Sequence, residues 1–178
     1  MENKLKDDPR YQNHGSRPDL AGEHPLGDGL QLVALIIFAI GLIFDHLFLG
    51  WASNLRQLVP ITTRLISGGL LIMFGAYLAI FGIRFVFLDY TQEPRMYSSG
   101  FFSRVRHPIY LGVLIVYGGV LLIILSPVGV GIFIAICFLY NWLAEDEEER
   151  MTAIFGSRYR TYIQKTPRWL PIRFTQRK

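Results

Sequence analysis

Two short clusters of this sequence carry the side chains most able to do chemistry. One is residues 106–110, of sequence RHPIY, and the other is the run of acidic residues 145–149. An arginine beside the free amides of a helix start attracts an anionic group such as a carboxylate or a phosphate. Carboxylates in turn attract ammonium groups and hydroxyls. A site built from both clusters could therefore hold a zwitterionic ligand.

The first cluster is predicted to begin a helix. Proline favours the first helical position because an amide hydrogen would be unpaired there in any residue, so His107 is the predicted cap and Pro108 the first helical residue. Tyr110 follows His107 by three positions and is expected on the same face. The alternative is an interfacial anchor of arginine, histidine and tyrosine, which membrane proteins use widely.

Both clusters border apolar segments long enough to cross a membrane. Of the 178 residues, 51% are hydrophobic and only 18% are charged, which is more apolar than a soluble domain of this size. About 20 helical residues span a hydrocarbon layer of roughly 30 Å. We therefore predict an all-α, polytopic membrane protein with about four transmembrane helices, at residues 30–49, 65–88, 108–125 and 128–144.

The last two spans are predicted to form a helical hairpin. They meet at Ser126 and Pro127, which leaves no room for a loop. His107 lies 19 residues before Ser126, and Glu147 lies 20 residues after Pro127. Two helices of nearly equal rise return the acidic cluster to the depth of His107. We therefore expect the two clusters to line one cavity, with Asn141 adding a polar group within the membrane.

Lysine and arginine gather before the first span, between the second and third spans, and at the end of the chain. Short segments rich in these residues stay cytoplasmic. Both termini and the central connection are thus predicted to be cytoplasmic in an integral, multi-pass membrane protein. The same bias accounts for the net charge of +4 without nucleic acid as a partner. The expected partners are the lipid bilayer and an acceptor substrate, and no obligate protein partner is evident.

The two ends of the sequence differ in character from the apolar segments between them. Residues 1–29 are predicted to be a polar cytoplasmic tail, and residues 30–178 the membrane domain. Apolar and aromatic residues recur every three to four positions from Met151 to Pro171, which predicts an amphipathic cytoplasmic segment that lies on the membrane surface or roofs the site. A single cysteine and four scattered histidines predict neither an intramolecular disulfide nor a metal site.

Glycines mark one face of the second span. Gly68, Gly75 and Gly82 recur every seven residues, which places them on one stripe of a helix. Such a stripe lets a neighbouring helix approach closely. The simpler interpretation is packing without functional meaning.

These motifs together resemble the isoprenylcysteine carboxyl methyltransferase family and its relatives among membrane phospholipid methyltransferases. The resemblance runs from about Tyr97 to Pro171, a little under half of the chain. It begins with an aromatic and glycine-containing lead, continues through the RHPIY cluster and the hairpin, and ends with a glutamate pair and an aromatic tail. The residues that carry it are Ser99, Gly100, Phe102, Arg106, His107, Pro108, Tyr110, Gly112, Glu147, Glu148, Phe155, Gly156, Tyr159 and Tyr162.

The resemblance implies an enzyme that uses S-adenosyl-L-methionine without a Rossmann domain. The implied cofactor-binding residues are Tyr97, Phe102, Arg106, His107, Pro108, Ile109, Tyr110 and Glu147. We expect Glu148, His107 and Asn141 to be the catalytic residues, with Glu148 or His107 as the base if the acceptor must lose a proton. Carboxyl methyltransferases of the family also place an arginine shortly before the glutamates, but residues 140–144 contain no basic residue. A prenylcysteine carboxylate is therefore a doubtful substrate.

The expected function is S-adenosylmethionine-dependent methyl transfer to a lipophilic or small apolar acceptor at the membrane. A second interpretation is an NADPH-dependent membrane reductase related to the sterol reductases, which have a similar C-terminal architecture. A third is a non-catalytic four-helix scaffold or a transporter. Transporters usually need an ionisable residue deep in the bilayer, whereas Asp45 and His46 lie near the end of the first span.

Overall fold

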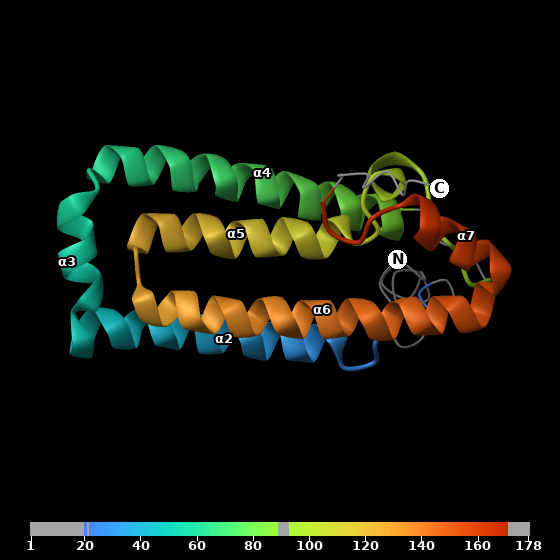
Figure 1. The fold of residues 1–178 in the computed structure, drawn as a ribbon, viewed down its shortest axis with the longest axis horizontal. Helices are drawn as coiled ribbons and strands as arrows, with labels where there is room; N and C mark the ends of the chain where they lie inside the picture. The colour runs from blue at the N-terminus through green and yellow to red at the C-terminus, as the bar shows by residue number, and fades with distance from the viewer. Residues whose placement is uncertain (1–19, 21, 89–92, 171–178) are drawn as a thin grey trace, which may run out of the picture. The chain divides into compact units, whose positions relative to one another are not determined.

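Four apolar helices of the described residues occupy the predicted spans (Figure 1). They are α2 (Gly27–Phe44), α4 (Ile61–Phe87), α5 (Pro108–Ile124) and α6 (Pro127–Phe155). The structure is a computed structural model that describes residues 20, 22–88 and 93–170, without the side chains of 51–54. Every regular element among these residues is helical, which confirms the predicted fold class. Most of the predicted tail, residues 1–29, lies outside the described part.

Three of these helices are long and apolar enough to cross a membrane, within the part of the chain that the structure describes. They are α2 together with the π-helical turn η4 (Asp45–Leu49), α4, and α6. Helix α5, with 17 residues, is a shorter apolar helix. The short elements are α3 (Trp51–Leu58), the 3₁₀ turn η5 (Gly100–Ser103) and α7 (Ser157–Lys165).

The boundaries differ most from the predicted ones in two places. Helix α4 begins at Ile61 rather than at 65, because the polar residues before Leu65 form its first turn. Helix α6 does not end with its apolar part at 144 but runs through the acidic cluster to Phe155. No glycine or proline lies between Gly131 and Gly156, and the positive φ of 57° at Gly156 separates α6 from α7.

The predicted hairpin is confirmed. Proline begins both of its helices, α5 at Pro108 and α6 at Pro127, and only two residues separate them. Ser126 caps α6, because its Oγ accepts a hydrogen bond from the amide of Gly129 at 3.0 Å. The chain therefore reverses within the shortest possible connection, as the sequence indicated.

The structure divides into two compact units. The first unit comprises Met1–Pro25, Ile80–Ile109 and Ala144–Lys178, and the second comprises Leu26–Ala79 and Tyr110–Leu143. The prediction of a single membrane domain over 30–178 stays a prediction.

Close glycine contacts join α4 and α5 in the second unit. A Cβ on Gly75 would lie 2.5 Å from the carbonyl oxygen of Gly112, and a Cβ on Gly68 would lie 2.6 Å from that of Gly119. The two backbones are therefore in contact, as expected of small residues at a membrane helix interface. The predicted glycine stripe is confirmed as a packing surface.

Two buried polar side chains hold the turn between α5 and α6 in the second unit. Asp45 is fully buried and accepts a hydrogen bond from the Ser126 hydroxyl. Arg64 donates from Nη1 to the carbonyl oxygen of Ile123 at 2.7 Å. These contacts tie η4 and α4 to the hairpin turn.

The first unit packs α7 against the segment that precedes α5. Helix α7 buries Tyr159 and Tyr162, and the Tyr162 hydroxyl donates to the carbonyl oxygen of Phe102. The rings of Phe85, Tyr97 and Phe102 lie 5.9 to 6.0 Å apart. This aromatic cluster fixes the residues that lead into the RHPIY motif.

Candidate active site

A segment from the end of the chain crosses the start of α5. We call Thr166–Leu170 the C-terminal strap. The amide of Arg106 donates to the carbonyl oxygen of Pro167 at 3.0 Å, and the amide of His107 donates to that of Arg168 at 3.4 Å. The rings of Trp169 and His107 lie 6.0 Å apart. The strap therefore covers His107, which agrees with the roof that was one of the two predicted roles of this segment.

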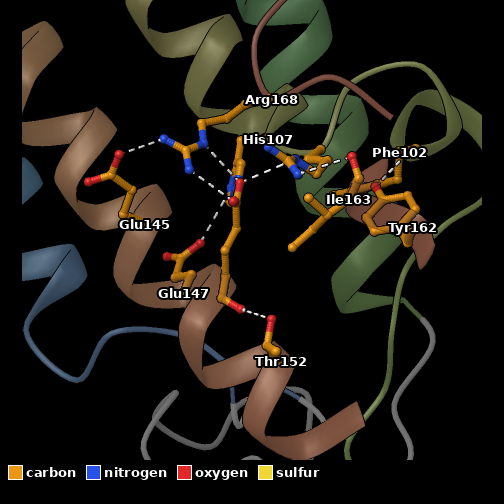
Figure 2. A network of polar contacts seen from close by, with 10 residues as sticks. Phe102, His107, Glu145, Glu147, Thr152, Tyr162, Ile163 and Arg168 are labelled. Atoms are coloured by element: carbon orange, nitrogen blue, oxygen red, sulfur yellow. Dashed lines mark hydrogen bonds and ion pairs between the residues drawn. The ribbon is translucent and has the colours of Figure 1, made fainter. Parts of the chain in front are cut away.

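Figure 2 shows a polar network around His107, Glu145 and Arg168, and the Glu148 carboxylate is its centre. Its Oε1 accepts hydrogen bonds from His107 Nε2 and from Arg168 Nε, both at 3.0 Å, and its Oε2 accepts one from Arg168 Nη2 at 2.9 Å. The side chain is only 8% exposed. Because a carboxylate only accepts, the Nε2 of His107 carries a proton in this arrangement.

Arg106 adds a second guanidinium to the same carboxylate. Its Nε lies 3.2 Å from Glu148 Oε1 but is not aligned for a hydrogen bond and is a buried nitrogen without a hydrogen-bond partner. Its Nη1 donates to the carbonyl oxygen of Ile163 in α7 at 3.4 Å. Arg106 therefore faces Glu148 and α7, so part of the predicted anion-binding group is already engaged within the protein.

The neighbouring carboxylates differ in their surroundings. Glu147 Oε2 lies 3.5 Å from His107 Nδ1, and the Glu147 side chain is 15% exposed. Glu145 is 52% exposed and accepts from Arg168 Nη1 at 2.9 Å, so Arg168 bridges Glu145 and Glu148 (Figure 2). Asp146 pairs with Arg150, one helical turn away. The acidic run thus divides between the network and the exposed face of α6.

Burial and the two guanidinium groups set the charge of this site. Burial lowers the pKa of His107 below its ordinary value, and the positive charges of Arg106 and Arg168 act in the same direction, whereas Glu148 opposes the shift. Burial raises the pKa of Tyr159 and Tyr162, so both phenols stay neutral. Although burial opposes its charge, hydrogen bonds to Glu148 and Glu145 raise the pKa of Arg168.

A polar cavity of about 310 Å³ lies in the same unit. The loop 94–99 lines it together with Phe85, Phe155 and Arg158. Tyr97 belongs to this loop and to the aromatic cluster described above. The hydroxyls of Ser98 and Ser99 and the aromatic rings give the cavity walls that suit a small polar aromatic molecule.

The family model described as "Phospholipid methyltransferase" matches residues 61–158, more than half of the 178 residues. The chain belongs to this family. A methanethiol S-methyltransferase of Crocosphaera subtropica is 26% identical over 157 residues, which cover 83% of this chain and 53% of that protein. The chain therefore spans about half the length of this relative. No solved structure matches this chain significantly.

The structure brings most of the predicted site residues of this phospholipid methyltransferase family member into the first unit. Arg106, His107, Glu147 and Glu148 form the network. Tyr97 and Phe102 pack against each other beside it. The two remaining members, Pro108 and Ile109, begin α5, where Ile109 packs against Gly82.

Two predicted site residues belong to the second unit. Tyr110 packs edge-to-face on Tyr140, with ring centroids 5.2 Å apart, and Asn141 follows Tyr140 on α6. The expectation that Tyr110 shares a face with His107 stays a prediction, because the two residues belong to different units.

Sequence reasoning missed Arg168 as a member of the site. The RHPIY cluster and the acidic cluster were linked by counting the residues of one hairpin. Arg168 reaches Glu148 only after the end of α6, the bend at Gly156 and the whole of α7. The available signal was an arginine between Pro167 and Trp169, in a segment already expected to roof the site.

Proposed function

We propose that this protein is a membrane methyltransferase that uses S-adenosyl-L-methionine and acts on a lipophilic or small apolar acceptor. The observation that carries the proposal is the meeting of His107 with Glu147 and Glu148 in one buried network. This pairing joins the two motifs on which the family resemblance rests. The family match favours methyl transfer over the reductase and scaffold interpretations.

The residues of the first unit fit this cofactor chemically. Glu147 is the better candidate for its cationic amine, because its side chain is 15% exposed and that of Glu148 only 8%. The aromatic rings and serine hydroxyls of the 310 Å³ cavity suit a nucleoside. When bound, the cofactor supplies an electrophilic methyl group on sulfur. The strap over His107 contributes by excluding water.

The same network limits which residue can accept a proton. Glu148 accepts three hydrogen bonds from nitrogen donors, so its role is to hold His107 and Arg168. The lowered pKa of His107 keeps its ring neutral, and we assign the base to His107 where the acceptor carries a proton. An acceptor that arrives as a thiolate or a free amine needs no base.

The second unit supports an apolar acceptor. It contains a cavity of about 440 Å³ lined mainly by apolar side chains of α2 and α5, with a hydrogen bond of 3.3 Å from the Tyr140 hydroxyl to Gln31 Oε1 at its polar wall. An apolar molecule dissolved in the bilayer matches such a lining. The named substrate of the relative from Crocosphaera subtropica, methanethiol, is a small thiol, and we propose small or lipophilic thiols as the first acceptors to examine.

Calorimetric binding of S-adenosylhomocysteine to the purified full-length chain tests the cofactor. We expect binding by the wild type, at least tenfold weaker binding by Glu147→Gln, and unchanged binding by Glu149→Gln, which changes an exposed residue. Transfer of a labelled methyl group to thiols and to extracted lipids then identifies the acceptor. A folded wild type that binds NADPH but not S-adenosylhomocysteine would exclude the proposal.

A further inference from the structure

Arg168 combines three contacts that no other described residue of the site combines. Its guanidinium meets both oxygens of Glu148, at 3.0 and 2.9 Å, and its Nη1 meets Glu145 at 2.9 Å. Its backbone carbonyl oxygen accepts from the amide of His107 at 3.4 Å. One residue of the C-terminal strap therefore contacts both the start of α5 and the acidic run of α6.

The fork geometry of these contacts fixes the Glu148 side chain. Two parallel N–H···O bonds hold a carboxylate in one plane, which a point charge does not. Glu148 Oε1 accepts hydrogen bonds from Arg168 Nε and from His107 Nε2 at the same time. The orientation of the Glu148 carboxylate therefore sets the position of the oxygen to which His107 donates. The orientation of the imidazole therefore depends on Arg168.

The balance of charges around His107 also depends on Arg168. Glu148 and Glu147 both face His107, and two carboxylates around one buried imidazole favour its protonated form. Arg168 and Arg106 compensate them, so that the ring can stay neutral. The phenols of Tyr159 and Tyr162 on α7, which lie near Glu148 and Arg106, are uncharged and do not change this balance.

We propose that Arg168 is a positioning residue of the methyltransferase site, which sets the orientation and the tautomer of His107 through Glu148. This deepens the proposed function and rests on it for its catalytic meaning. Arg168 acts through Glu148 and His107 rather than on the reacting atoms. The C-terminal strap is accordingly a functional part of the site as well as its cover.

The test uses ¹⁵N-histidine spectra of the full-length protein in detergent, with the His107 signal assigned by its loss in His107→Gln. In the wild type we expect a proton on Nε2. Arg168→Gln removes a positive charge and the fork, and it should raise the His107 pKa by about one unit and mix the two tautomers. Arg168→Lys keeps the charge and loses the fork, so it should mix the tautomers with less than half of that pKa shift. Arg160→Gln, on the exposed side of α7, is the matched control.

The outcomes separate this inference from the proposed function. Unchanged His107 tautomer and pKa in both Arg168 variants would overturn the positioning role, even if the wild type binds S-adenosylhomocysteine. A wild type that fails to bind S-adenosylhomocysteine, with the predicted spectral changes present, would refute the proposed function alone. If Arg168→Gln does not fold, Arg168→Lys carries the test, with at least fivefold weaker S-adenosylhomocysteine binding than Arg160→Gln as the second expected result.

Discussion

At the scale of single residues, the central pairing could be predicted from counting. The equal rise of α5 and α6 brings His107 to the level of Glu147 and Glu148, and the structure places them in contact. Which glutamate is buried could not be predicted, because it depends on the rotation of α6 about its axis. That rotation is set by packing with the strap and α7, whose path after Gly156 no local pattern specifies.

Removing the Glu148 carboxylate should destabilise the protein more than removing any neighbouring acid. Glu148→Ala leaves Arg106 and Arg168 without their shared carboxylate, and uncompensated buried charge costs about 3 kcal/mol. Glu149→Ala, at an exposed position, should change stability by about 0.5 kcal/mol or less. Thermal unfolding in one detergent compares the two variants. Equal midpoints would show that the network contributes nothing to stability.

Acid should destabilise the folded state partly through His107. Its pKa is lowered by burial in the folded protein, so the unfolded chain takes up a proton first as the pH falls. The contribution of His107 to stability is therefore complete above its unfolded pKa of about 6.5 and decreases below it. Between pH 7 and pH 5 the unfolding midpoint of the wild type should fall more steeply than that of His107→Gln. Parallel curves for the two proteins would contradict the neutral buried imidazole.

At the scale of elements, the positions of proline and glycine predicted helix boundaries and packing faces that a hydropathy profile does not show. Pro108 was correctly predicted to begin α5, and α6 begins at Pro127, one residue before the predicted span. The spacing of glycines predicted the face of α4 on which a neighbouring helix, α5, packs. The long extension of α6 beyond its apolar part follows from the lack of any breaker before Gly156. Helix α3 was not predicted, since its eight residues are too few for a periodic pattern to stand out.

The α4–α5 contact predicts that alanine substitutions at two glycines of α4, Gly75 and Gly69, have different effects on stability. Gly75→Ala would place a Cβ 2.5 Å from the backbone of Gly112, which only a shift of the helices can relieve, at a cost of about 1–3 kcal/mol. Gly69 has no atom within 4 Å of its would-be Cβ, and Gly69→Ala should be neutral or slightly stabilising because alanine favours a helix. Chemical or thermal unfolding of the two variants makes the comparison. A Gly75→Ala variant as stable as Gly69→Ala would exclude close backbone packing.

At the scale of the whole molecule, fold class was the most predictable property. A bilayer leaves an isolated chain few options other than long apolar helices, and the described residues contain three helices of spanning length and one shorter apolar helix. The division into two units was not predicted, because α4, α5 and α6 each pass from one unit to the other without a change in composition that marks the boundary. Orientation in the membrane follows from charge alone and stays a prediction.

That orientation can be tested on the full chain with two introduced cysteines. Cys137 is the only natural cysteine, so Cys137→Ser gives an unreactive background. Gln57→Cys in α3 and Thr161→Cys in α7 are both exposed positions. Because lysine and arginine favour the cytoplasmic side for the C-terminal segment, a membrane-impermeant maleimide added to intact cells should label Gln57→Cys and leave Thr161→Cys unlabelled until the cells are permeabilised. Labelling of Thr161→Cys in intact cells would place the glutamate network outside the cytoplasm, where cytoplasmic S-adenosylmethionine could not reach it, and the proposed function would have to be abandoned with the orientation.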